Sequence, residues 1–284
     1  MDRLILSFLG GFRARLESGS SVIVPTKRGR ALLAYLACSP TESHSRDKLA
    51  TLFWGDSPQP HSRHNLRQTL LVLRSALDPV TPSILRSDSA CVSLDRARLV
   101  VDAVDFEQLA AEGSPQSLEQ AGALYQGDFL AGIDAGDQAF EEWLRDERER
   151  LYELAVEVYA KLLTFQREAG LTESAVRSAG RLLALDPAQE IVHRTLMRLY
   201  VILGRPRAAL RQYERCARTL RELGTEPEEK TKELLRAISS ARLAEAEIPA
   251  PALPLAPSRQ LRSLDVQASR VSAAPISSSR SNRT

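Results

Sequence analysis

The sequence is poor in aromatic residues and in cysteine. Phe, Trp and Tyr make up 5% of its 284 residues. Leucine, alanine and arginine are abundant instead, a bias that favours helices over sheets. The three cysteines, Cys38, Cys91 and Cys216, are far apart and form no CxxC pair. We therefore expect neither a disulfide framework nor a zinc module, and interpret all three as reduced thiols of a cytoplasmic protein.

Signals for membranes and catalysis are also missing. No run of about 18 apolar residues occurs, so no membrane-spanning helix is expected, and the apolar start is too short for a signal peptide. The motifs GxxxxGK[ST], GxSxG and HExxH are absent. His61 and His64 have the spacing of a metal pair, but no third ligand lies nearby. We therefore expect no enzyme activity, no cofactor and no metal.

Charge is distributed unevenly along a chain whose net charge is only +2. Residues 1–100 contain 14 lysines and arginines against 8 acidic residues. Residues 101–246 contain 19 against 26. This asymmetry suggests that the front of the chain meets a polyanion.

The first hundred residues mix strand and helix patterns. Three apolar runs punctuated by glycine predict a small antiparallel sheet, at 3–11, 12–18 and 21–25. A helix from Lys27 to Cys38 and a polar turn follow, and Ser45 then caps a second helix. A third helix at about 60–77 has Leu66, Leu70, Leu73 and Leu77 on one stripe and ends at Asp78-Pro79. Residues 83–88 and 91–95 then predict a β-hairpin, and the unit closes at about residue 104.

The second part has no strand pattern. Helical runs are predicted at 105–112, 115–125, 138–169, 172–185, 188–203, 206–223 and 227–245. Several pairs match at one constant offset, including Gly170 with Gly204 and Tyr159 with His193. That offset, with a glycine at the turn, is the period of tetratricopeptide helix pairs, about 34 residues. The fold class predicted is mixed α+β and then all-α, with domains at 1–104 and 105–246 and a disordered, Pro/Ser-rich tail at 247–284.

The order of elements in the front domain predicts a winged helix, whose third helix enters the major groove of DNA while the hairpin touches an adjacent groove. We assign His64, Arg67 and Gln68 to positions near the bases. Arg63 and Arg74 are assigned to phosphates, and Arg86 to the minor groove. The basic start of the first helix is expected to touch the DNA backbone, through Lys27, Arg28 and Arg30. Leu71, on the same outward stripe, either contacts a thymine methyl or packs under the hairpin.

Four segments resemble one family: KRGRALLAYLACSP, the run from Ser45 to Leu77, YQGDFLAG, and FEEWLRDERERLYELAVEVYAKLL. They are similar to the Streptomyces antibiotic regulatory protein type of activator, over about residues 4–242. In that family an OmpR-type winged helix precedes a bacterial transcriptional activator domain of tetratricopeptide-like helices. The resemblance implies a cytoplasmic activator that binds direct repeats of double-stranded DNA in promoters and contacts RNA polymerase. It also implies that the helical domain mediates homodimer or partner contact.

A different function remains open from the sequence. The helical repeat would then be a scaffold for partner proteins, and the winged helix would have lost its contact with DNA. The family tends to carry basic residues late in the third helix, where this chain has Leu71 and Val72. The target site is therefore left undefined.

Overall fold

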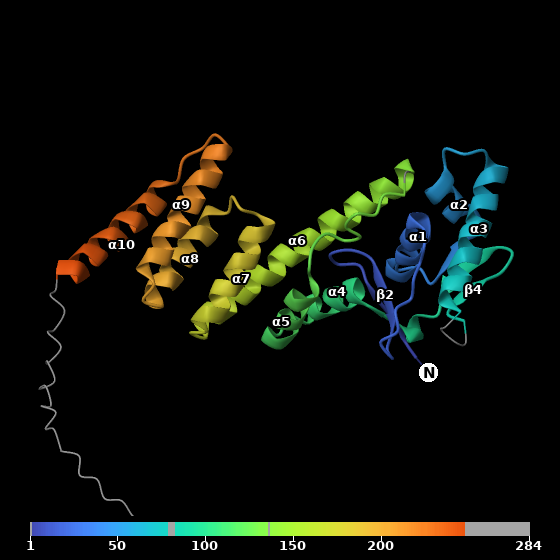
Figure 1. Cartoon of the computed structure of the whole chain (residues 1–284), viewed down its shortest axis with the longest axis horizontal. Coiled ribbons are helices and arrows are strands. Elements are labelled where there is room, and N and C mark those ends of the chain that lie inside the picture. Colours follow the sequence, from blue (N-terminus) through green and yellow to red (C-terminus); the bar gives the residue numbers. More distant parts are fainter. Residues whose placement is uncertain (1, 79–82, 136, 248–284) are drawn as a thin grey trace, which may run out of the picture.

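A computed structural model describes residues 2–78, 83–135 and 137–247. The molecule is elongated: two small sheets and α1–α3 lie at one end, and α7–α10 lie at the other (Figure 1). The long helix α6, Gln138–Glu168, runs between the two ends. The tail predicted at 247–284 lies, past Glu247, outside the described residues.

The first sheet has the strand order β2-β1-β6. β1, Leu4–Ser7, pairs antiparallel with β2, Arg13–Leu16, and parallel with β6, Leu99–Val101. The strand predicted at 21–25 is wrong, because this segment meets β2 only through one isolated bridge, Arg15↔Ser21. Pro25 has no N–H for a ladder, and Thr26 already caps α1. The third strand of the sheet is instead β6, which follows all three helices of the front part in the sequence.

Three helices and a second sheet follow the first hairpin. α1 covers Lys27–Cys38, α2 covers Arg46–Trp54 and α3 covers Gln59–Leu77. β4, Leu85–Ser87, and β5, Cys91–Leu94, form the predicted hairpin. A strand that the sequence analysis took for part of a turn, β3 at Ser43–Ser45, pairs with β5 and makes the order β3-β5-β4. Its central residue, His44, is buried between two exposed serines, a pattern too short to stand out in the sequence.

The first helix of the helical part, α4, begins at Asp102, close to the predicted boundary at about residue 104. The helices of this part agree with the predicted ranges to within a few residues. They are α4 Asp102–Glu112, α5 Pro115–Leu124, α6, α7 Thr172–Leu185, α8 Glu190–Ile202, α9 Pro206–Glu222 and α10 Glu229–Glu247.

Two glycines that match in the sequence at the constant offset also share a backbone conformation. Gly170 and Gly204 both adopt left-handed conformations, with φ of 70° and 66°. Each donates its N–H to the carbonyl of the third residue before it, Arg167 and Val201 respectively. A side chain at either glycine would be strained, because non-glycine residues rarely adopt this region. The two turns between helices are therefore structurally equivalent.

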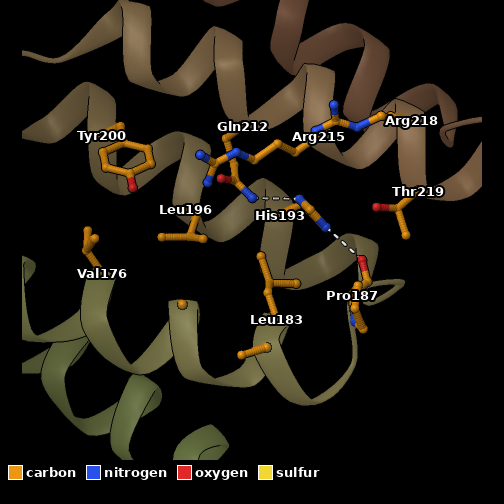
Figure 2. Close-up of a pocket in the computed structure, with 12 residues that line it drawn as sticks. Val176, Leu183, Pro187, His193, Leu196, Tyr200, Gln212, Arg215, Arg218 and Thr219 are labelled. Carbon is orange, nitrogen blue, oxygen red and sulfur yellow. Dashed lines mark hydrogen bonds between the residues drawn. The ribbon is translucent and has the colours of Figure 1, made fainter.

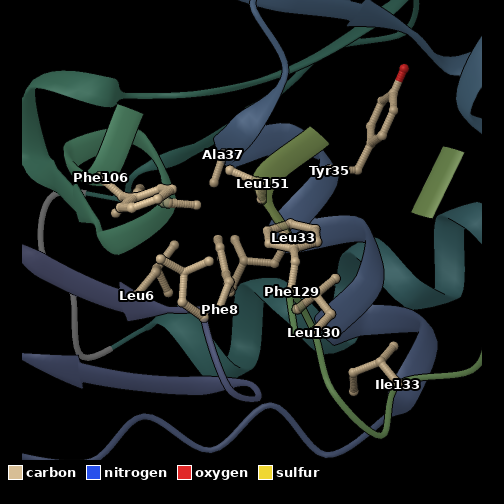
Figure 3. Close-up of a cluster of buried hydrophobic side chains, with 14 of the residues drawn as sticks. Leu6, Phe8, Leu33, Tyr35, Ala37, Phe106, Phe129, Leu130, Ile133 and Leu151 are labelled. Atoms are coloured by element: carbon tan, nitrogen blue, oxygen red, sulfur yellow. The ribbon is translucent and has the colours of Figure 1, made fainter. Parts of the chain in front are cut away.

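One buried core connects both parts of the chain. Phe8 just after β1, Phe106 of α4 and Phe129 of the loop before α6 are each 1% exposed or less. They meet Leu33 of α1 and Leu151 of α6 (Figure 3). The start of α6 adds a second contact, because Phe140 stacks on Phe53 of α2 with ring centroids 4.8 Å apart. The helical part is thus packed directly against the helices that carry the candidate site.

Candidate nucleic-acid interface

Helix α3 has one buried face and one exposed face. Leu66, Leu70, Leu73 and Leu77 are each at most 4% exposed, which confirms the predicted leucine stripe. The side chains predicted to lie near DNA bases, His64, Arg67 and Gln68, are exposed on the opposite side. In the part of the chain that the structure describes, these three side chains make no hydrogen bond or ion pair. Their polar atoms are free to meet an external ligand.

The start of α3 is fixed to α2. The buried hydroxyl of Ser62 donates to the carbonyl oxygen of Trp54, the last residue of α2, at 2.7 Å. Arg63 forms an ion pair with Asp47 of α2, with Nε and Oδ1 2.9 Å apart. Both side chains are more than half exposed, so this pair contributes little stability, but it orients the guanidinium along the helix.

The end of α3 is fixed to the hairpin. Arg74 Nη2 donates to both the carbonyl oxygen and the hydroxyl oxygen of Ser87, at 3.2 and 3.1 Å. Arg46, at the start of α2, donates to the same hydroxyl oxygen at 3.3 Å and to the carbonyl oxygen of Asp88 at 3.2 Å. Three elements therefore meet at Ser87.

Arg46 was missed by the sequence analysis, although a signal for it exists. A basic residue in the first turn of a helix opposes the helix dipole, so its presence there indicates another role. The structure shows that role: Arg46 connects α2 to the hairpin through its backbone as well, since its N–H donates to Ala90 O at 2.8 Å.

Leu71 is 49% exposed on the outward face of α3. It is therefore not packed beneath the hairpin. The other alternative, contact with a thymine methyl, stays a prediction.

The hairpin turn is held by Asp88. One carboxylate oxygen accepts the N–H groups of Ala90 and Cys91, both at 2.7 Å, and these bonds lower the pKa of Asp88. Arg86 forms an ion pair with Asp95 at 2.9 Å. Because successive side chains of a strand point to opposite faces, Arg86 points away from Ser87 and from the end of α3. The structure does not bring Arg86 together with the arginines of α3.

The basic residues at the start of α1 diverge. Lys27 is exposed, whereas Arg28 donates to Ala135 O at 3.0 Å and stacks over Trp54. Arg30 donates to Val24 O at 2.7 Å and lies over Phe12. Arg28 and Arg30 thus have partners within the chain, and Lys27 alone of the three is oriented toward solvent.

The described ranges offer neither a metal cluster nor a membrane span. Within them, no group of three or more His, Cys, Asp or Glu residues is placed to hold a metal ion. No helix in the described part of the chain combines the length and the apolar character needed to cross a bilayer.

Comparison with known proteins places the chain in a family. Residues 96–239, half of the chain, match the bacterial transcriptional activator domain, and the chain belongs to this family. This match supports the resemblance to regulators of the Streptomyces antibiotic regulatory protein type that the sequence indicated. No curated protein matches the sequence.

The fold is shared with a solved structure, Mycobacterium tuberculosis EmbR in complex with a low affinity phosphopeptide. The TM-score is 0.58 and the identity is 20%, and the match covers 85% of this chain. It covers 66% of the EmbR chain, so this chain spans just under two thirds of that protein. The likeness shows a common arrangement of helices and small sheets.

Proposed function

We propose that the chain binds double-stranded DNA as a winged helix, with α3 in the major groove and the β4–β5 hairpin as the wing. The observation that carries this proposal is the outward face of α3. His64 and Gln68 are exposed opposite four buried leucines, and Arg67 is exposed at the side of the same face; none of the three has a partner among the described residues. Arginine suits guanine edges and phosphates, and glutamine suits adenine, so these side chains match what a groove offers.

The ends of α3 supply the contacts that position it. Arg63 and Arg74 are separated by three turns of helix, which corresponds to about 16 Å along the axis. That separation exceeds the roughly 12 Å width of the major groove, so the two guanidinium groups can reach phosphates on either side while Arg67 lies between them. Lys27 adds a further phosphate contact. The partners of Arg28 and Arg30 argue instead for a role in holding α1 against its neighbours.

The helical part serves activation rather than DNA recognition in this proposal. We propose that residues 105–246 form a tetratricopeptide-like repeat that contacts RNA polymerase or a second copy of the chain. Two copies would place two α3 helices on direct repeats in a promoter. The protein would act in the cytoplasm, where bacterial DNA lies, and without catalysis.

Charge reversal at Arg67 tests the DNA contact. Duplexes selected from a random pool by the full chain provide the probe, and fluorescence anisotropy at several salt concentrations provides the affinity. We expect Arg67→Glu to weaken binding at least about tenfold at every salt concentration and to relax the preference for the selected sequence, because Arg67 is assigned to the bases. Arg198→Glu is a matched control, because Arg198 is an exposed arginine of α8 far from α3.

The scaffold alternative predicts a different outcome. If the full chain selects no duplex, or if Arg67→Glu binds as the wild type does at every salt concentration, then the outward face of α3 does not read DNA.

A further inference from the structure

Helix α9 carries a row of arginines that the DNA-binding proposal does not use. Arg207, Arg211, Arg215 and Arg218 are exposed and follow one another at intervals of four, four and three residues, which puts them on one face. The opposite side of α9 is buried through Ala209, Gln212, Cys216 and Leu220. Over the described residues, none of the four arginines makes an ion pair or a hydrogen bond through its side chain.

Two exposed carboxylates, Glu214 and Glu222, share the face of α9 that carries the four arginines. Residues 101–246 are acidic overall, and some of the other arginines there are paired. Arg150 meets Glu107 and Glu147, Arg194 meets Glu228, and Arg205 meets Glu173. Because the four arginines of α9 outnumber Glu214 and Glu222, the face is a net positive stripe on a negative background, and such a stripe attracts an anionic partner.

A groove lies beside this stripe. It has a volume of about 380 Å³ and is bounded by α7, α8 and α9. Figure 2 shows Val176 and Leu183 of α7 on one side, Arg215 and Arg218 of α9 on the other, and Leu196 between them. The groove therefore combines an apolar floor with a cationic rim.

The groove wall is held in place by a buried polar pair. His193 and Gln212 are each 4% exposed. His193 Nε2 lies 3.0 Å from Pro187 O, so this nitrogen donates, because a carbonyl oxygen only accepts. His193 Nδ1 is then the acceptor for the side-chain amide of Gln212 at 2.7 Å. Both sides of the imidazole are bonded, and the groove is preformed without a ligand.

We propose that this groove binds an acidic peptide segment of a partner protein, with an apolar side chain in the groove and carboxylates on the arginine stripe. The stripe runs along three turns of α9, about 16 Å of helix, and so extends beyond a compact ligand seated in the groove. The protein's own residues 248–284 do not suit it, since they contain five arginines and one aspartate. The inference rests on α7–α9 alone and is independent of DNA binding by α3.

Gly180 offers a way to close the groove without disturbing the fold. It lies on the groove wall within α7, and a Cβ atom added there would meet nothing within 4 Å. Gly180→Leu therefore places a side chain in the space that the peptide's apolar residue would use. The helix itself tolerates leucine better than glycine.

The test uses the full chain and two fluorescein-labelled dodecapeptides. Both carry the same number of glutamates, and their centres are Leu-Phe-Leu or Ser-Ser-Ser. By anisotropy we expect the Leu-Phe-Leu peptide to bind and the serine peptide to bind at least about tenfold more weakly. The double variant R215E/R218E and Gly180→Leu should each lose at least about tenfold in affinity. Arg198→Glu should not change it, because Arg198 lies on the side of α8 opposite Leu196 and Tyr200.

Several results would overturn the proposal. The Leu-Phe-Leu peptide could fail to bind at low salt, the two peptides could bind equally, or Gly180→Leu could bind as the wild type does. A loss of duplex DNA binding in R215E/R218E would make the stripe a nucleic-acid surface. A change from dimer to monomer in sedimentation would make it a contact with a second copy. Selection of DNA by α3 is expected to be unaffected in both variants, so this proposal and the DNA-binding proposal fail separately.

Discussion

Arg74 of α3 donates two hydrogen bonds to Ser87 of β4, one to its hydroxyl oxygen and one to its carbonyl oxygen. The side chain of Arg46 reaches the same hydroxyl oxygen from α2. Ser87 therefore helps to position the hairpin relative to both helices. If the hairpin is the wing of a winged helix, its position relative to α3 decides whether both can contact one duplex.

Ser87→Ala removes the hydroxyl acceptor that Arg74 and Arg46 share. We expect a stability loss of about 1 kcal/mol or less, because the bonds are partly exposed, and a fewfold loss in DNA affinity because the hairpin is less well placed. Urea unfolding measures the stability, and anisotropy with a selected duplex measures the affinity. An unchanged affinity would show that the hairpin needs no such support.

The double variant with Arg74→Ala separates positioning from direct contact. If Arg74 acts only by holding Ser87, its replacement in the Ser87→Ala background removes only the remaining bond to the backbone carbonyl of residue 87, so the further loss of affinity should be smaller than in the wild-type background. If it also binds a phosphate, as predicted from the sequence, the affinity falls again and the salt dependence decreases by about one contact. If the losses of affinity caused by the two substitutions simply add, and the salt dependence of binding does not change, both roles of Arg74 are contradicted.

The contact between α6 and α2 gives a prediction about stability. Phe140 is fully buried and stacks on Phe53, so Phe140→Ala should cost about 3–5 kcal/mol. Phe165→Ala is the matched control on the same helix, because Phe165 is 37% exposed and should cost less than about 1.5 kcal/mol. Urea unfolding followed by tryptophan fluorescence measures both. If both variants lose the same free energy of unfolding, the two ends of α6 do not differ in packing.

Local patterns were enough to predict α3. Its leucines recur at intervals of four, three and four, and Asp78-Pro79 follows directly, so periodicity and a stop signal agree. The hairpin was predictable for the same reason, since its strands are neighbours in the sequence. β6 was not, because it pairs Leu99 with Leu4 at the far end of the front part, and no local pattern encodes that partner.

The candidate site was predictable only in part. The exposed face of α3 follows from its period, and His64, Arg67 and Gln68 lie on it as expected. Which arginines are free depends on neighbours from other elements. Arg28 meets a carbonyl in the loop before α6, and Arg86 meets Asp95 on the adjoining segment. A count of basic residues cannot distinguish such internal partners from DNA contacts.

Buried His44 predicts a pH dependence of stability. Burial is the main cause that lowers its pKa from 6.5, with Lys48 and Arg96 adding to it and a hydrogen bond to Thr41 opposing it. The unfolded chain takes up a proton near pH 6.5, but the folded protein does so only at lower pH. The free energy of unfolding therefore falls as the pH decreases from about 6.5 toward the folded pKa.

Replacing His44 by phenylalanine should remove this part of the pH dependence. The variant also removes a buried nitrogen, Nε2, that has no hydrogen-bond partner, so stability at pH 7.5 should be maintained. Urea unfolding at pH 7.5, 6.5 and 5.5 compares the two proteins. If the wild type and the variant lose the same unfolding free energy between pH 7.5 and 5.5, His44 does not cause the pH dependence. If the unfolding free energy of the wild type depends on pH just as steeply at high salt, burial lowers the pKa of His44 more than the neighbouring charges do.

Two glycines within helices should respond oppositely to the same substitution. Gly180 of α7 has open space where a Cβ would lie, so Gly180→Ala should stabilise the protein by about 0.5–1 kcal/mol through its effect on the unfolded chain. At Gly122 of α5, a Cβ would lie 3.0 Å from the ring of Tyr159, whose hydroxyl donates to Gly122 O at 2.7 Å. Moving that ring would strain the bond, so Gly122→Ala should cost about 1–3 kcal/mol. Thermal unfolding of both variants checks the prediction, which fails if they shift the midpoint in the same direction.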